Sequence, residues 1–252
     1  MRNIRLIARL DVKTEHLVKG VQLEGLRKLG RPNDFARRYY AEGIDEIVYV
    51  DIVASLYERS SLLPIIERAT SDIFIPMTVV GGIRSVEDAR NALHSGADKV
   101  GVNTAAIKNP DLISQIASQF GAQCMVQSIE AKNTAPGAWE VYYDNGREKT
   151  GIDVLEWAVE TEARGAGEIF LTSVDREGAG HGMDLDLITN VCDRVKIPVI
   201  ASGGVGEIDH IRDIVKNSNV SSVAVAKILH YEQSSIAEIK AALKTVDGVE
   251  VR

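Results

Sequence analysis

The sequence is poor in the residues that mark disulfide-bonded proteins, and it has no long apolar run. Its 252 residues include two cysteines, six prolines and only 5% aromatic residues. Cys124 and Cys192 do not form a CxxC motif, which excludes a paired zinc or redox signature and favours a reducing cytoplasm. Arginines interrupt the apolar residues of the N-terminus, MRNIRLIARLDVK, so it predicts neither a signal peptide nor a membrane span.

An excess of positive charge is also missing. The chain has 29 basic and 36 acidic residues and a formal net charge of −7. This balance argues against a nucleic-acid or membrane partner held by bulk charge. There is no GxGxxG or Walker motif, and the five histidines lack metal-ligand spacing, so we expect no cofactor and no metal.

What the sequence does contain is an alternation of short apolar runs with amphipathic, helix-like stretches. Runs that are apolar almost throughout are typical of parallel strands covered on both faces. Eight such runs can be counted, at 4–11, 46–51, 75–80, 98–103, 123–130, 168–174, 197–202 and 221–226. Eight strand–helix units predict an α/β fold of the (β/α)8 barrel type, as one domain over residues 1–252.

An internal repeat divides this barrel into two halves of four units. Residues 74–107 align without gaps to residues 196–229, an offset of 122 that also places 41–50 on 163–172. The halves are expected at about 1–121 and 122–252. Two segments interrupt the pattern. Residues 14–31 are too long for a simple strand–helix loop and suggest a functional lid, and Asn145-Gly146 predicts a hairpin.

Polar residues at the ends of the predicted strands are the catalytic candidates, since the active site of this fold lies there. Asp11 and Glu130 each end an apolar run and are each followed by x-Lys. The symmetry of the halves predicts that they lie opposite each other at the barrel mouth, where two carboxylates suit general acid and base catalysis. The alternative is that each forms a structural ion pair with its neighbouring lysine.

Two glycine pairs predict anion binding at the same end. Gly81-Gly82 and Gly203-Gly204 follow strands at symmetric positions, and glycine lets backbone N–H groups approach a phosphate. Asn103-Thr104 and Ala226-Lys227 end the strands that follow these two loops. We therefore expect two anion sites and a small-molecule substrate with two phosphates.

Charged residues also begin four of the strands, where apolar residues would be usual. They are Arg5, Glu46, Lys99 and Glu168. Their signs predict an alternating ring that closes the bottom of the barrel. Charges at this face are normally structural, so a stability network is the alternative to a functional port.

Together these segments resemble the cyclase subunit of imidazole glycerol phosphate synthase, over nearly the whole chain. The matching segments are LDVK (10–13), LVKG (17–20), VYVDIVAS (48–55), TVVGGIRSVEDA (78–89), GADKVGVNTAAI (96–107), WEVY (139–142), LTSVDREG (171–178), PVIASGG (198–204) and ILH (228–230). The resemblance implies a heterodimer with a glutaminase, which docks at the barrel bottom and supplies ammonia. That ammonia cyclises a phosphoribulosyl substrate to imidazole glycerol phosphate and aminoimidazole carboxamide ribotide.

The resemblance also assigns roles to individual residues. It implies catalytic roles for Asp11, Glu130 and Lys19, and an interface with the glutaminase at Asp98. It makes the charged ring the ammonia gate. Substrate and phosphate binding would fall to Gly82, Asn103, Thr104, Glu177, Gly178, Gly204, Ala226 and Lys227.

The departures from the family lie at the mouth. The family has aspartate where this chain has Glu130 and Glu177, usually cysteine in place of Arg9, and a small hydroxyl residue in place of Lys227. Two alternatives therefore stay open. One is a paralogue that channels glutaminase-derived ammonia for sugar amidination in surface polysaccharide synthesis. The other is a non-catalytic activator of a glutaminase.

Overall fold

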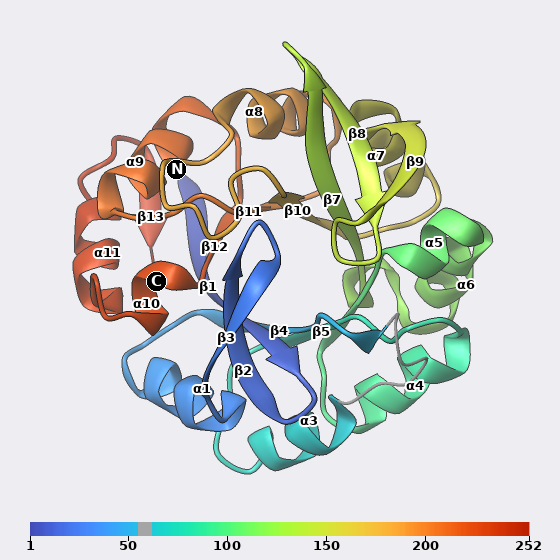
Figure 1. Ribbon diagram of the computed structural model, residues 1–252, viewed down its shortest axis with the longest axis horizontal. Coiled ribbons are helices and arrows are strands. Elements are labelled where there is room, and N and C mark those ends of the chain that lie inside the picture. The colour runs from blue at the N-terminus through green and yellow to red at the C-terminus, as the bar shows by residue number, and fades with distance from the viewer. Residues whose placement is uncertain (55–61, 252) are drawn as a thin grey trace.

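Eight parallel strands close into a barrel surrounded by helices in the computed structural model, which describes residues 1–54 and 62–251 (Figure 1). The strands follow the order β1, β4, β5, β6, β7, β10, β11 and β12, and β7 pairs with β10 while β12 pairs with β1. Their bounds are Arg2–Lys13, Glu46–Asp51, Met77–Val80, Lys99–Val102, Met125–Ala135, Glu168–Ser173, Val199–Ser202 and Ser222–Val225. The predicted fold and all eight predicted strands are confirmed.

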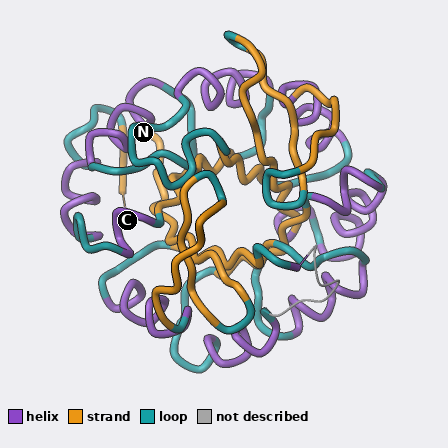
Figure 2. Tube along the Cα trace, viewed as in Figure 1, coloured by secondary structure: helices purple, strands orange, loops and turns teal. Residues whose placement is uncertain are grey.

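The helices form the outer ring that Figure 2 shows around the strands. They are α1 (Pro32–Ala41), α3 (Leu63–Ala69), α4 (Val86–His94), α5 (Thr104–Lys108), α6 (Asp111–Phe120), α7 (Val154–Ala163), α8 (Leu185–Arg194), α9 (Ile208–Asn217), α10 (Lys227–His230) and α11 (Ile236–Leu243), with a 3-10 turn at Ala122–Cys124. Ser85 caps α4 by accepting a hydrogen bond from the Asp88 N–H. In the described part of the chain, no helix is long and apolar enough to cross a membrane.

The two halves share unusual backbone conformations, although the repeat is not gapless. Gly81 and Gly82 have φ of 94° and 78°, and Gly203 and Gly204 have 99° and 98°, so all four positions in these two turns favour glycine. Strands β6 and β12, by contrast, begin at Lys99 and Ser222, an offset of 123. The expected offset of 122 is therefore wrong beyond α9, which is one residue longer than α4.

Both segments that interrupt the pattern are β-hairpins. β2 (His16–Val21) and β3 (Glu24–Gly30) fill the long segment after β1, and in Figure 1 they cross the front of the barrel. Their turn places Gln22 and Leu23 at φ of 51° and 65°, a conformation usually signalled by asparagine or glycine. The predicted hairpin at Asn145-Gly146 is confirmed between β8 (Ala138–Tyr143) and β9 (Glu148–Asp153). The short strand β13 (Val249–Val251) pairs with the start of β1.

An apolar layer fills the middle of the barrel. It consists of Ile7, Val48, Val80, Val126, Phe170, Ile200 and Ala224, all at most 4% exposed. Side chains alternate along a strand, so the layer has charged and polar interior positions on both sides of it. On β1 these positions are Arg5 below the layer and Arg9 and Asp11 above it. Ser55, the last residue of the matching segment 48–55, lies outside the described residues.

Phe170 is the largest side chain of this layer, and its loss should destabilise the fold. We expect Phe170→Ala to lower the free energy of unfolding by about 3–5 kcal/mol, because it leaves a cavity in the barrel centre. Urea denaturation measures this change. Phe74 is 75% exposed, so Phe74→Ala should change stability by no more than about 0.5 kcal/mol. Equal effects of the two substitutions would contradict this description of the core.

Candidate active site

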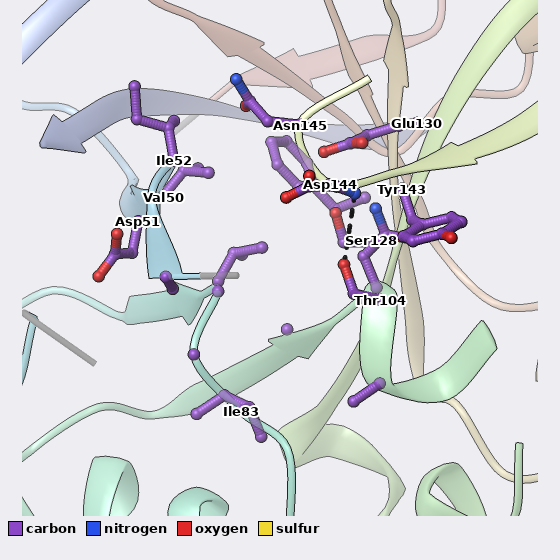
Figure 3. Close-up of a pocket in the computed structure, with 18 of the residues that line it drawn as sticks. Val50, Asp51, Ile52, Ile83, Thr104, Ser128, Glu130, Tyr143, Asp144 and Asn145 are labelled. Carbon is purple, nitrogen blue, oxygen red and sulfur yellow. Dashed lines mark hydrogen bonds between the residues drawn. The ribbon is translucent and has the colours of Figure 1, made fainter. Parts of the chain in front are cut away.

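A cavity of about 540 Å³ opens at the carboxyl ends of the strands. Figure 3 shows Ser128, Glu130 and Thr104 on one side of this pocket and Val50, Asp51 and Ile52 on the other. Four of the predicted site residues line it, namely Gly82, Asn103, Thr104 and Glu130. The first glycine loop, the Asn103 amide, the Thr104 hydroxyl and the Glu130 carboxyl therefore surround one space, which Asp51 and Asp144 also line.

The remaining predicted mouth residues, except Asp11, border a second cavity, which is almost filled. Its volume is about 10 Å³, room for about one water molecule. Its lining includes the predicted residues Lys19, Glu177, Gly178, Gly204, Ala226 and Lys227. The two symmetric glycine loops thus border cavities of very different size, one open and one almost filled.

Backbone packing explains why the second glycine loop is covered. The Gly182 N–H donates to the Gly204 carbonyl at 3.0 Å, so the segment before α8 lies directly on this loop. A Cβ at Gly204 would approach the Gly182 oxygen to 2.1 Å. The Lys227 ammonium donates to the Ala179 carbonyl at 3.2 Å and closes the same side.

Arg9 lies between the two cavities and lines both of them. Its guanidinium pairs with Asp11 at 2.8 Å and with Glu177 at 3.3 Å. Lys19 pairs with the same two carboxylates, at 3.2 Å for Asp11. We call Arg9, Asp11, Lys19 and Glu177 the mouth ion cluster; each of them is at most 4% exposed.

The charges of the mouth ion cluster hold it ionised. Burial alone would raise the pKa of both carboxyls, but Arg9 and Lys19 outweigh it, so the pKa of Asp11 falls to about 2 and that of Glu177 is also lowered. Burial would likewise lower the pKa values of Arg9 and Lys19, yet the carboxylates raise both. All four groups are charged at neutral pH.

Glu130 is in the opposite situation. It is partly buried and lines the large cavity, where it accepts a hydrogen bond from the Gly146 N–H at 2.7 Å. Burial raises its pKa to about 7, against the lowering effects of the Gly146 bond, the Arg9 charge and Asn103. A carboxyl group with this pKa can both give and take a proton near neutral pH.

Asp11 and Glu130 thus lie on opposite strands, as the symmetry predicts, but they do not share a cavity. β1 and β7 are four strands apart in the closed order, which places them on opposite sides of the barrel. Glu130 lines the large cavity, but Asp11 lines neither cavity. The alternative of structural ion pairs with the neighbouring Lys13 and Lys132 is not found among the described side chains, since Asp11 pairs with Arg9 and Lys19 instead. Arg9 was missed as a site residue, although a charge within an apolar strand is a signal for one.

At the other end of the barrel, the predicted ring is confirmed as a closed cycle of four ion pairs. Arg5 contacts Glu46 at 2.7 Å and Glu168 at 2.5 Å. Lys99 contacts the same carboxylates at 3.3 and 2.8 Å. The two glutamates are buried, while about a fifth of each cationic side chain remains exposed. Their carboxylates raise the pKa of Arg5 despite its burial.

Asp98 lies beside this ring on the exposed bottom face. Its carboxylate accepts a hydrogen bond from the Met77 N–H at 2.7 Å, which ties the start of β5 to that of β6. Within residues 1–54 and 62–251, no group of three His, Cys, Asp or Glu side chains could hold a metal ion.

Comparison with known proteins identifies the kind of barrel. The histidine biosynthesis protein family matches residues 5–235. A relative from Legionella pneumophila, the imidazole glycerol phosphate synthase subunit HisF, is 59% identical over 209 residues. This match covers 83% of the present chain and 99% of the relative.

The raised pKa of Glu130 has a consequence for stability. A carboxyl whose folded pKa lies above its unfolded value stabilises the fold at low pH and loses that contribution as pH rises through about 7. Glu130→Gln has no carboxyl to ionise, so it does not lose stability in this way as the pH rises. Its stability relative to the natural chain should therefore increase between pH 5 and pH 8, as measured by urea denaturation. Glu15→Gln, at an exposed position, controls for the lost charge; an identical pH trend in both variants would refute the assignment.

Proposed function

The chain belongs to the HisF family, the cyclase subunits of imidazole glycerol phosphate synthase in histidine biosynthesis, and we propose that its mouth cyclises the phosphoribulosyl formimino carboxamide ribotide with ammonia. The products would be imidazole glycerol phosphate and aminoimidazole carboxamide ribotide. One observation carries the proposal: a charged ring and a cavity with an ionisable carboxyl lie at opposite ends of one barrel. Such a barrel can receive a small reactant at one face and use it at the other.

The proposed substrate has a phosphate at each end, and the mouth has a glycine loop for each. One phosphate would bind at Gly82 with Asn103 and Thr104, which line the open cavity. The other would bind at the second loop, where Gly178, Gly204, Ala226 and Lys227 line the small cavity beside Glu177. Because backbone atoms cover this loop, the segment before α8 must move to admit the second phosphate.

At the bottom face, the proposed partner is a glutaminase that delivers ammonia through the ring. Glu46 and Glu168 each contact both cations, so the cycle has no open side. Passage requires at least one pair to separate, and Arg5 and Lys99 are the more exposed members. Asp98 follows directly before Lys99 and is exposed, which places it within reach of a docked subunit. A cytoplasmic location is part of the same proposal.

A second candidate is that the ammonia serves a different acceptor, such as a sugar amidinated by a separate enzyme for surface polysaccharide. The closed second cavity favours it, because a substrate with one anionic end would need only the open site. The ring at the bottom serves both candidates equally well. The two therefore differ only at the mouth.

Turnover and complementation separate these candidates. For the cyclase, we expect ammonium-dependent conversion of the two-phosphate substrate and rescue of a histidine auxotroph that lacks this subunit. Glu130→Gln should lower turnover about 10²–10⁴-fold, the usual contribution of a positioned acid or base. The second candidate would be favoured if the natural chain fails in both assays but still stimulates a glutaminase.

Opening the ring should uncouple the two subunits. Arg5→Ala removes two of the four ion pairs and leaves Glu46 and Glu168 with one cation. In the complex with a glutaminase, we expect fewer products per glutamine hydrolysed, while turnover with added ammonium salt stays within about twofold. Arg37→Ala, which removes exposed ion pairs of α1, is the control. If Arg5→Ala still forms as much product per glutamine hydrolysed as the natural chain, the ring would be a stability network and not a port.

A further inference from the structure

The segment between β10 and α8 covers the second glycine loop with its backbone. It contains the five-residue run GAGHG (178–182), which we call the strap. Gly178, Gly180 and Gly182 have φ of 70°, 77° and 98°, a left-handed conformation that glycine adopts without a steric penalty. A backbone with alternate glycines can also change conformation more easily than one with bulky side chains. The strap is therefore suited both to lie on the loop and to leave it.

The strap and the loop approach each other too closely to leave room for an anion. A Cβ at Gly204 would lie 2.1 Å from the Gly182 oxygen, and a Cβ at Gly206 would lie 2.2 Å from the Gly180 oxygen. The cavity that remains has a volume of about 10 Å³, room for about one water molecule. A phosphate group is larger than a water molecule, so the strap must move before one can bind at this loop.

In the described part of the chain, two hydrogen bonds connect the strap to residues outside the segment between β10 and α8. The Gly182 N–H donates to the Gly204 carbonyl at 3.0 Å. The Lys227 ammonium donates to the Ala179 carbonyl at 3.2 Å. The first bond joins two backbones, whereas the second uses a cationic side chain with three donors. Lys227 is thus the charged group that fastens the strap.

Lys227 carries a charge that the neighbouring carboxylates do not neutralise. The mouth ion cluster has two cations and two carboxylates, which pair with one another. Lys227 lines the small cavity together with members of this cluster, yet it forms no ion pair with any carboxylate of the described residues. A neutral carbonyl is a weaker partner for an ammonium than an anion is. The Ala179 carbonyl is therefore a partner that an anion can replace.

We propose that Lys227 is an anion-operated latch on the second glycine loop. Without an anion, its ammonium holds the strap closed through the Ala179 carbonyl. When a phosphate group arrives, the ammonium exchanges that carbonyl for a phosphate oxygen, and the strap moves off the loop. The backbone of the loop then becomes accessible to the same phosphate. The proposal rests on the proposed function only for the substrate to which this phosphate belongs.

The latch gives the two glycine loops different roles in binding. The first loop borders the open cavity of about 540 Å³ and can take a phosphate without rearrangement. A substrate held there presents its second phosphate to Lys227 at a high effective concentration. Binding is therefore ordered, first at Gly82 and then at Gly204. A substrate with one phosphate would occupy the first loop and leave the strap closed.

The first test measures binding of inorganic phosphate by NMR, with the Gly82 and Gly204 amide resonances as separate reporters of the two loops. Lys227→Met should weaken binding at Gly204 about tenfold, the loss expected for a charge-assisted hydrogen bond, and change binding at Gly82 by less than about twofold. Lys227→Arg keeps the charge and should retain binding at Gly204. Lys216→Met, at an exposed position of α9, is the control. Undiminished binding at Gly204 in Lys227→Met, or none there in the natural chain, would overturn the proposal.

The second test measures opening of the strap by hydrogen exchange at the Gly182 amide, which is bonded to Gly204 in the closed form. Without phosphate, this amide should exchange faster in Lys227→Met than in the natural chain. Phosphate should speed its exchange in the natural chain, and sodium chloride of equal ionic strength should not. Phosphate that binds at Gly204 without changing this exchange would overturn the proposal. Neither test uses turnover, so a chain whose strap opens with phosphate but which converts no substrate would refute only the proposed function.

Discussion

Each interior arginine of strand β1 is paired with two carboxylates, and this pairing organises both ends of the barrel. Arg5 holds Glu46 and Glu168 below the apolar layer, and Arg9 holds Asp11 and Glu177 above it. A buried charge without a partner is costly, so each arginine determines which side chains must converge on it. A lysine completes each group, Lys99 below and Lys19 above.

The two groups differ in what surrounds them. The lower one is a cycle with its cations partly in solvent, so a docked subunit could contact and separate them. The upper one is sealed beneath the β2–β3 hairpin, whose Gln22 N–H donates to the Glu177 carbonyl at 2.7 Å. The same kind of ion pairing therefore forms a partly exposed cycle at one end of the barrel and a buried cluster at the other. Glu130 lines the open cavity beside that buried cluster.

Much of this could be predicted from the sequence. The apolar runs and the glycine pairs determine the barrel and its two halves, and the charges that begin strands predict the ring, because alternation along a strand fixes which side chains point inward. The β2–β3 hairpin could not be predicted, since its turn uses Gln22 and Leu23 instead of the usual turn residues. The unequal cavities were also beyond reach. They depend on contacts between loops far apart in the chain, such as Gly182 on Gly204.

In the proposed function, ammonia enters at the strand starts and reacts at the strand ends. Isotope transfer tests that link most directly. The complex with a glutaminase would be supplied with glutamine labelled with ¹⁵N in its amide, in the presence of excess unlabelled ammonium, and the product nitrogen analysed by mass spectrometry. Ammonia that passes through the barrel predicts a product that keeps most of the label. A label diluted to the level of the ammonium in solution would contradict the account.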